Sequence, residues 1–344
     1  MRPDVRFPAR WWGDERGAES GHPISRRDPS VTISAPSAPS PHFTLEAVED
    51  GVYVAIATDQ GHALCNSGIV DLGDGTLVFD SMLTPQAGAD LRRVAEHLTG
   101  HPVTYLVNSH CHGDHIRGNS SFPSVRIVST RRVRELIDER AVKALETDRA
   151  TVAADLEKLR QPDSGLTDRD RAVFGGWFEG ILATPEGCLI PGPDLFVDGR
   201  LVLAGPKRQV EVLSFGGGHS PSDVLAYLPD SQVGFLGDLL SIGFHPGVGD
   251  GVPAEWLRIL DEVLKLGIDR ALPGHGPVGG REDIEFLQGY LQDLIRLAHH
   301  ARRLSIRRDQ LVSVPMPEKY AAWVFRPFFA ENLARVYDLT AMPA

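Results

Sequence analysis

The stretch His110-Cys111-His112-Gly113-Asp114-His115 decides the fold of this sequence. It directly follows the apolar residues 103–107, which are typical of a buried strand. Four metal-binding side chains therefore gather in one loop at a strand end, and imidazole and carboxylate groups suit Zn²⁺. Side chains two residues apart in extended backbone point the same way, so His110 and His112 can bind one ion. Asp114 and His115 are offset from that pair and can face a second ion, whereas Cys111 points away and is not expected to be a ligand.

Three further candidate ligands stand at the ends of other predicted strands. His219 follows the β-rich stretch 210–213, Asp238 ends the apolar run 233–237, and His275 lies between Gly274 and Gly276. Those glycines let the backbone turn tightly and leave room beside the imidazole. A short motif is informative when its context agrees with it, and here four predicted strands each end in a metal-binding residue.

These residues carry a resemblance to the metallo-β-lactamase-fold hydrolases, which covers roughly residue 43 to the C-terminus. It includes Leu77-Val78-Phe79-Asp80-Ser81, similar to the first motif of the family. It also includes residues 256–276, similar to the family's last helix, strand and Pro-Gly-His-Gly loop. The resemblance implies an α/β fold, a four-layer αββα sandwich, and the chain shows a helical insertion within it.

The resemblance also implies a set of ligands and their division between two metals. One ion would bind His110, His112 and His219; the other would bind Asp114, His115 and His275; and Asp238 would bridge them. The carboxylate of Asp80 would support the site from behind the ligands. We expect two Zn²⁺ ions per chain, with iron or manganese as alternatives, and we expect Asp114 and Asp238 to be the catalytic residues.

The predicted reaction is hydrolysis of an ester, lactone, thioester or amide bond in a small molecule. Zn²⁺ lowers the pKa of a bound water to about 7, so that a bridging hydroxide is available at neutral pH without a Ser or Cys nucleophile. Asp238 makes efficient β-lactam hydrolysis doubtful, because the β-lactamase subclasses carry Cys or no ligand there. Two alternatives stay open within the fold: a phosphodiesterase or nuclease, and a persulfide dioxygenase-like enzyme with one iron on His110, His219 and Asp238.

Composition limits the partners of this 344-residue chain. Its formal net charge of −11 argues against a nucleic-acid partner, because binding to phosphates needs a basic face. Three scattered cysteines make no disulfide framework, and no apolar run reaches the length of a membrane span. We therefore expect a cytoplasmic enzyme with a small-molecule substrate.

The chain is expected to contain a disordered arm, 1–41, and one domain, 42–344. The arm is rich in Pro, Ser, Gly and Arg and lacks apolar periodicity. Helices are predicted over 85–98, 256–266 and 282–303, and Asp198-Gly199-Arg200 signals a hairpin in a second β-rich half that starts near Leu195.

Between the two β-rich halves lies the predicted helical insertion, about 129–193. Apolar residues recur at helical spacing over 133–159, and Thr167 and Asp168 are placed to begin a second helix. The insertion either only covers sheet or forms a lid over the metals. In the lid interpretation Phe174, Trp177 and Phe178 line the substrate pocket. His245 is interpreted as a loop histidine rather than a substrate contact.

Overall fold

The structure, a computed structural model, describes residues 40–159 and 166–340, and the strands in these residues form two sheets. The first sheet has the strand order β1-β2-β3-β4-β5-β6-β7. It consists of β1 (Phe43–Glu49), β2 (Val52–Ala57), β3 (Ser67–Asp71), β4 (Thr76–Phe79), β5 (Val103–Val107), β6 (Arg126–Ser129) and β7 (Leu195–Phe196). Pairs from β1 to β4 are antiparallel and those from β4 to β7 are parallel.

The second sheet has the order β12-β11-β10-β9-β8. It consists of β8 (Arg200–Ala204), β9 (Gln209–Gly216), β10 (Asp223–Leu228), β11 (Val233–Ser241) and β12 (Arg270–His275). Neighbouring strands are antiparallel except β11 and β12, which run parallel. This parallel pair aligns Ser241 with His275 and so brings the ends of both strands to one place.

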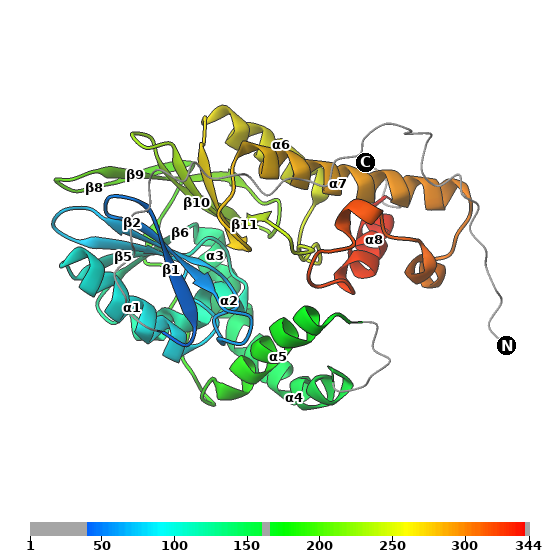
Figure 1. Cartoon of the computed structure of the whole chain (residues 1–344), viewed down its shortest axis with the longest axis horizontal. Helices are drawn as coiled ribbons and strands as arrows, with labels where there is room; N and C mark the ends of the chain where they lie inside the picture. Colours follow the sequence, from blue (N-terminus) through cyan, green and yellow to red (C-terminus); the bar gives the residue numbers. More distant parts are fainter. Residues whose placement is uncertain (1–39, 160–165, 341–344) are drawn as a thin grey trace.

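Helices cover the outer faces of both sheets, and Figure 1 shows α1 on one side of the molecule and α6 and α7 on the other. The α-helices are α1 (Pro85–Thr99), α2 (Gly113–Ile116), α3 (Arg131–Leu136), α4 (Val142–Leu159), α5 (Asp168–Ala183), α6 (Pro253–Lys265), α7 (Arg281–Arg303) and α8 (Phe328–Leu339). Shorter helical turns span Arg117–Ser121, Ile137–Ala141, Arg308–Ser313 and Glu318–Tyr320. The predicted helices over 85–98, 256–266 and 282–303 are confirmed as α1, α6 and α7, with ends shifted by up to three residues.

The core between the sheets is apolar and closely packed. The rings of Phe79 on β4 and Phe235 on β11 stack with their centroids 5.7 Å apart. Gly68 on β3 makes this packing possible, because a Cβ there would lie 2.2 Å from the Phe235 ring. Behind the first sheet, Leu91 and Val94 of α1 pack on it; behind the second, Trp256 of α6 does the same. These layers confirm the predicted αββα sandwich.

The hairpin predicted at Asp198-Gly199-Arg200 is wrong. Gly199 does adopt a left-handed conformation, with φ 70°. However, β7 before it pairs with β6 of the first sheet, whereas β8 after it pairs with β9 of the second. The second sheet therefore begins at Arg200 and not near Leu195. The turn residues specify a local reversal of the chain, and they carry no information on which strand pairs with which.

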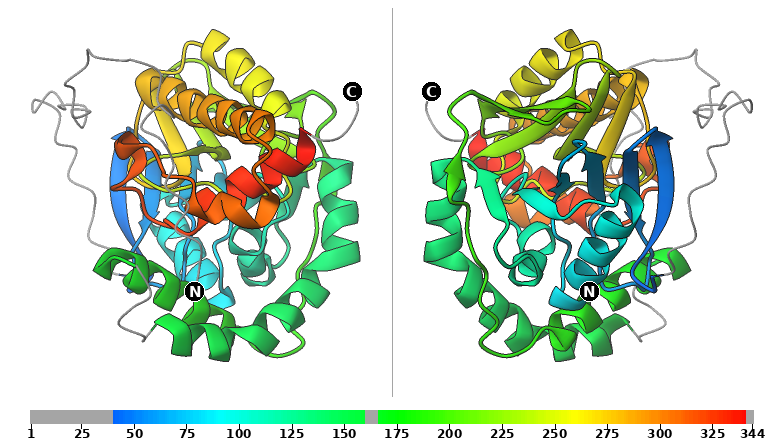
Figure 2. Two further views of the ribbon diagram at one scale, coloured as in Figure 1. Left: turned by 90° about the vertical axis from the view of Figure 1, so that its right-hand side faces the viewer. Right: turned by 90° about the vertical axis from the view of Figure 1, so that its left-hand side faces the viewer.

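The residues between β6 and β7 form α3, a π-helical turn (Ile137–Ala141), α4 and α5, which Figure 2 shows at the edge of the molecule away from α6. The predicted start of the second helix is confirmed. Thr167 is the N-cap of α5: its side chain accepts a hydrogen bond from Asp170 N, and the Asp170 carboxylate accepts one from Thr167 N. The predicted arm, 1–41, lies outside the described residues except for its last two. None of the helices in the described residues combines the length and apolar character needed to cross a membrane.

Candidate metal centre

The predicted ligands meet where strands of both sheets end. His110 and His112 follow β5, and α2 then carries Asp114 and His115. The second sheet supplies the other three: His219 from the β9–β10 loop, Asp238 from β11 and His275 from the last position of β12. Such crevices at the carboxyl ends of strands are where α/β folds usually bind ligands.

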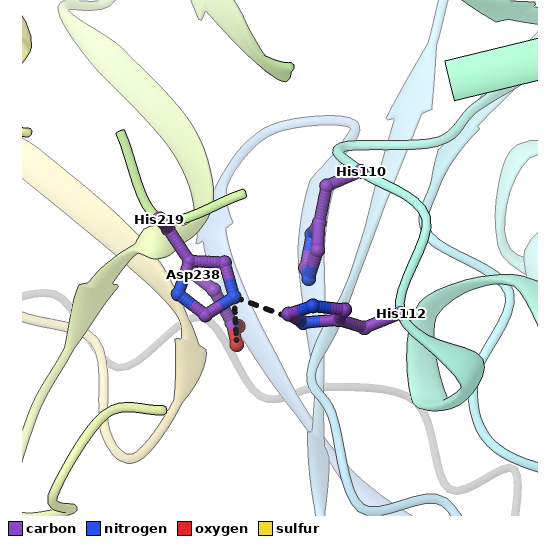
Figure 3. A group of neighbouring side chains, drawn as sticks. All are labelled: His110, His112, His219 and Asp238. Carbon is purple, nitrogen blue, oxygen red and sulfur yellow. Dashed lines mark hydrogen bonds and ion pairs between the residues drawn. The ribbon is translucent and has the colours of Figure 1, made fainter. Parts of the chain in front are cut away.

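A first group of side chains consists of His110, His112, His219 and Asp238, and their rings and carboxylate converge on one point in Figure 3. His219 Nε2 lies 3.0 Å from His112 Nδ1 and 3.3 Å from Asp238 Oδ2. A second group consists of Asp114, His115 and His275.

The spacing within the second group matches what a metal ion requires. Asp114 Oδ2 lies 3.4 Å from His115 Nε2 and 3.4 Å from His275 Nε2. Two ligand atoms that bind one ion at roughly 2.0–2.1 Å in tetrahedral geometry are separated by about 3.3–3.4 Å. The side chains therefore surround a space of the right size for a small divalent ion.

Asp238 lies between the two groups. Its Oδ1 is 3.1 Å from His115 Nε2 and 3.3 Å from His275 Nε2, while its Oδ2 faces His219. The backbone around it leaves no room to spare, since a Cβ on Gly274 would lie 1.9 Å from Asp238 Oδ1. The carboxylate thus has one oxygen toward each group, as a bridging ligand needs.

Hydrogen bonds behind the imidazoles orient their metal-facing nitrogens. His115 Nδ1 lies 2.7 Å from Asp80 Oδ2, and His275 Nδ1 lies 3.1 Å from the carbonyl of Leu64. Both acceptors require a proton on Nδ1, so the lone pair of each neutral ring is on Nε2, which faces the site. His112 is turned the other way: its Nε2 lies 3.3 Å from Asp250 Oδ2 and its Nδ1 faces the site. Outer hydrogen bonds of this kind are a common property of metal-binding histidines.

Asp80 is the centre of this supporting layer. It is fully buried and accepts hydrogen bonds from Ser109 N, Ser109 Oγ and His115 Nδ1, each 2.7 Å long. Ser109 Oγ also lies 2.9 Å from His110 Nδ1, so one carboxylate reaches both ligand groups. Asp80 has φ 61°, a left-handed conformation that is uncommon outside glycine and typical of sites where geometry is imposed by function.

Burial by itself would raise the pKa of the Asp238 and Asp114 carboxyls. The facing imidazoles outweigh burial: they hold the pKa of Asp238 well below its usual range and lower that of Asp114 to about 2. Burial also lowers the pKa of His110 well below its usual value and that of His219 to about 3. At neutral pH these four groups are therefore ionised carboxylates and neutral imidazoles, which are the forms that bind metals.

The surroundings of His115 and His275 favour a positively charged group. Burial acts to lower the pKa of His115 and His275, but the acidic groups around them raise it in both cases, well above the usual value for His115. His110 Nε2, His115 Nε2 and Asp238 Oδ1 are nevertheless buried without any hydrogen bond of good geometry. Buried polar atoms are rarely left in this state. Donor chemistry, spacing and these unsatisfied atoms all fit divalent metal ions.

A cavity of about 340 Å³ lies over the ligands. Its walls include Leu64, Ile190, Trp177 and residues of the C-terminal segment, Phe325 and Phe328. Trp177 is thus confirmed as a wall residue. Phe174 and Phe178 are not among the residues that line the cavity; they pack behind Trp177, at ring-centroid distances of 6.1 and 5.5 Å.

The comparison with known proteins places this chain in a family. The model of the metallo-beta-lactamase superfamily matches residues 61–275, more than half of the chain. The chain belongs to the metallo-beta-lactamase superfamily. A linear primary-alkylsulfatase from Pseudomonas sp. (strain ATCC 19151) is 24% identical over 284 residues, which cover 78% of this chain and 53% of that protein. The chain therefore spans about half the length of that relative.

Two further matches carry the name metallo-beta-lactamase. The metallo-beta-lactamase type 2 of Bacillus cereus is 22% identical over 236 residues, 67% of this chain and 74% of that protein. The solved structure of a metallo-beta-lactamase from Pontibacter korlensis superposes with a TM-score of 0.54 at 17% identity, over 73% of this chain and 99% of that chain. At this identity the structural match shows the fold alone.

Two residues that support the candidate ligands were not predicted from the sequence. Asp250, which holds His112, lies in a loop far along the chain. Asp223 shapes the loop of His219 by accepting hydrogen bonds from Gly218 N (2.7 Å) and His219 N (2.9 Å). An aspartate four residues after a glycine-rich ligand loop could have suggested this role; nothing could have suggested Asp250.

Cys111 and His245, which were not predicted to be ligands, both border the cavity. Cys111 is in neither ligand group, yet it lines the cavity, and burial raises the pKa of its thiol to about 11. His245 is 1% exposed, and its Nδ1 lies 3.1 Å from Tyr290 Oη. It also borders the cavity, so it is a buried wall residue rather than a plain loop histidine.

Proposed function

We propose that this protein is a hydrolase that binds two zinc ions and cleaves an ester, lactone, thioester or amide bond in a small molecule. The observation that carries the proposal is Asp238, with one oxygen toward each of two complete ligand groups. Neutral imidazoles and carboxylates are donors that suit zinc, and all seven predicted ligands lie in these two groups.

Zinc bound in such sites activates water near neutral pH and polarises the oxygen of the bond to be cleaved. The chain's own residues prepare the place for it. Asp238 and Asp114 hold negative charge there without a proton, and Asp80 fixes the ring of His115. Most of the ligand side chains are buried, and electrostatic interactions are stronger at buried positions than in water.

The cavity favours a small substrate with an apolar portion. Its volume of about 340 Å³ lies at the lower end of the range for small-molecule sites. Leu64, Ile190 and Trp177 provide apolar contacts beside the ligands. A cavity of this size supports a small molecule over a polynucleotide, which needs an extended basic groove.

A redox enzyme with a single iron on His110, His219 and Asp238 remains the rival. That chemistry has no use for Asp114, His115 and His275, yet their spacing is that of a second metal site. The complete second group therefore supports hydrolysis over the redox alternative.

The test combines metal analysis with a substrate panel. Plasma mass spectrometry on protein purified without added metal should give close to two zinc ions per chain. The same preparation should hydrolyse at least one of a lactone, a thioester, an aryl ester and an amide. His115→Ala should lower both metal content and turnover, whereas His299→Ala, a change at an exposed histidine of α7, should lower neither. One iron with no zinc and no hydrolysis would overturn the proposal.

A further inference from the structure

A buried arginine borders the metal centre. Arg117 follows α2 directly and is 3% exposed. Its guanidinium packs on the backbone of Gly113, where a Cβ would lie 2.6 Å from Arg117 Cζ. Arg117 therefore lies over the first turn of the helix that carries Asp114 and His115, and it lines the cavity.

The hydrogen bonds of Arg117 are incomplete. Its Nη2 pairs with the carboxylate of Asp148 on α4. Its Nε is buried and has no hydrogen-bond partner. An arginine stays charged at every physiological pH, and a buried N–H without an acceptor is costly. The guanidinium thus has unused donor capacity, and Arg117 is one of the residues that line the cavity.

A second arginine reaches the same cavity from the insertion. Arg140 belongs to the π-helical turn Ile137–Ala141, and turns of this type are frequent at functional sites. Within residues 40–159 and 166–340, no hydrogen bond or ion pair holds its guanidinium. Asp250, the hydrogen-bond partner of His112, lines the same cavity. Arg140 is thus a free cation at the edge of the metal centre.

The geometry points to an anion-recognition subsite formed by Arg117 and Arg140, which would hold the carboxylate or sulfate group of a substrate whose apolar portion contacts Trp177 and Phe325. This inference rests on the proposed function and adds the substrate class to it. Two guanidinium groups beside apolar walls in one cavity match an organic anion with an alkyl or aryl part. Planar guanidinium forks are well suited to the oxygen pairs of carboxylate and sulfate.

Substitution of Asp148 separates the proposed subsite from a purely structural role of the Arg117–Asp148 pair. Its carboxylate is 40% exposed, lines the cavity and occupies Arg117 Nη2. If Arg117 binds a ligand anion, Asp148 competes with that anion, and Asp148→Asn should strengthen binding. If the pair only stabilises the fold, Asp148→Asn and Arg117→Gln break the same contact and should have the same effect.

Binding can be measured by calorimetry on the zinc-loaded protein with octyl sulfate and octanoate, below their micelle concentrations, and with neutral 1-octanol. Arg117→Gln should weaken binding of at least one of the two anions by about tenfold or more, because hydrogen bonds to charged groups are the strong ones. The same substitution should change the affinity for 1-octanol by less than twofold. Arg140→Gln should weaken the same anion several-fold, and Asp148→Asn should tighten it several-fold. Arg132→Gln, an exposed arginine of α3 that pairs with Glu135, serves as the matched control and should change nothing.

The two anions distinguish the chemical sources: a larger loss for octyl sulfate indicates a sulfate ester, and a larger loss for octanoate indicates a carboxylate. Unchanged anion binding in both arginine variants would overturn the proposal, since the metal ions alone would then hold the anion. Weaker binding in Asp148→Asn would also overturn it. If Arg117→Gln does not fold, Arg140→Gln and Asp148→Asn still decide the matter. Because the readout is binding, the subsite can be confirmed even if every substrate of the hydrolase panel fails.

Discussion

Replacing Asp80 by Asn should weaken metal binding without disturbing the fold. The side chains have the same shape, and Asn tolerates the left-handed backbone at this position, where φ is 61°. The change removes one negative charge and turns one carboxylate oxygen into an N–H donor. Asp80 accepts three hydrogen bonds, so at least one of the three donors then faces another donor.

The size of the effect follows from these contacts. With Ser109 N still bonded to the amide oxygen, the new NH₂ group faces His115 Nδ1, which lies 2.7 Å from the atom it replaces. Loss of one hydrogen bond to a charged group costs about 1.5–3 kcal/mol. Loss of an outer partner of a metal ligand typically weakens metal binding 10- to 100-fold, which is about 1.4–2.7 kcal/mol. The two estimates agree. The loss of affinity should affect mainly the ion that His115 would bind.

The assay is a zinc titration against a chelating dye, which resolves the two binding steps. Asp71→Asn is the matched control. Asp71 is a carboxylate of β3 with 8% exposure that pairs with Lys207 Nζ at 3.0 Å and is in neither ligand group. The Asp71→Asn substitution should lower thermal stability slightly and leave both zinc affinities unchanged. If Asp80→Asn binds both ions as the unmodified protein does, the reasoning about the orientation of His115 is refuted.

Three further outcomes are expected. Asp238→Ala should reduce zinc from two equivalents to one or none while circular dichroism stays unchanged; full metal content and turnover would rule out the bridging role. Trp177→Ala should raise KM for substrates with long acyl groups at constant metal content, whereas a lower Tm with unchanged kinetics would show that Trp177 only packs against Phe174. Burial lowers the pKa of His245 from 6.5 to about 4, so below pH 6.5 the unfolded chain binds a proton that the folded protein does not. The free energy of unfolding should therefore fall by up to roughly 3 kcal/mol as the pH drops from 6.5 to 4, and urea titrations of His245→Gln should show less of this acid sensitivity.

The seven residues that form the two groups could be predicted from sequence, because each stands in or directly after an apolar stretch typical of a strand; β11, however, continues past Asp238 to Ser241. The pattern does not say which nitrogen of each ring faces the metal. That depends on distant partners, such as Asp250 for His112 and Leu64 for His275, which only the assembled fold brings near.

Helices were predicted to within a few residues, because capping residues and apolar spacing are local properties. Thr84, for example, caps α1 by accepting a hydrogen bond from Ala87 N. The pairing of β7 and β8 with different sheets was missed, since turn residues describe a local bend and pairing is decided by packing. The cavity walls were predicted only in part for the same reason: Phe325 lies far along the chain from Trp177, yet their ring centroids are 5.9 Å apart.

The candidate ligands come from both sheets, so bound ions would connect the two halves of the fold. His110, His112, Asp114 and His115 belong to the half of the chain that builds the first sheet, whereas His219, Asp238 and His275 belong to the other half. Ions held by both sets would act as cross-links between the halves, and they would bind the folded chain far better than the unfolded one. Each ion at a free concentration of 100 times its Kd would add about 2.7 kcal/mol to the free energy of unfolding. The resistance of this enzyme to heat would then depend on the metal supply of its surroundings, and a shortage of that metal would reduce the amount of folded protein as well as its activity.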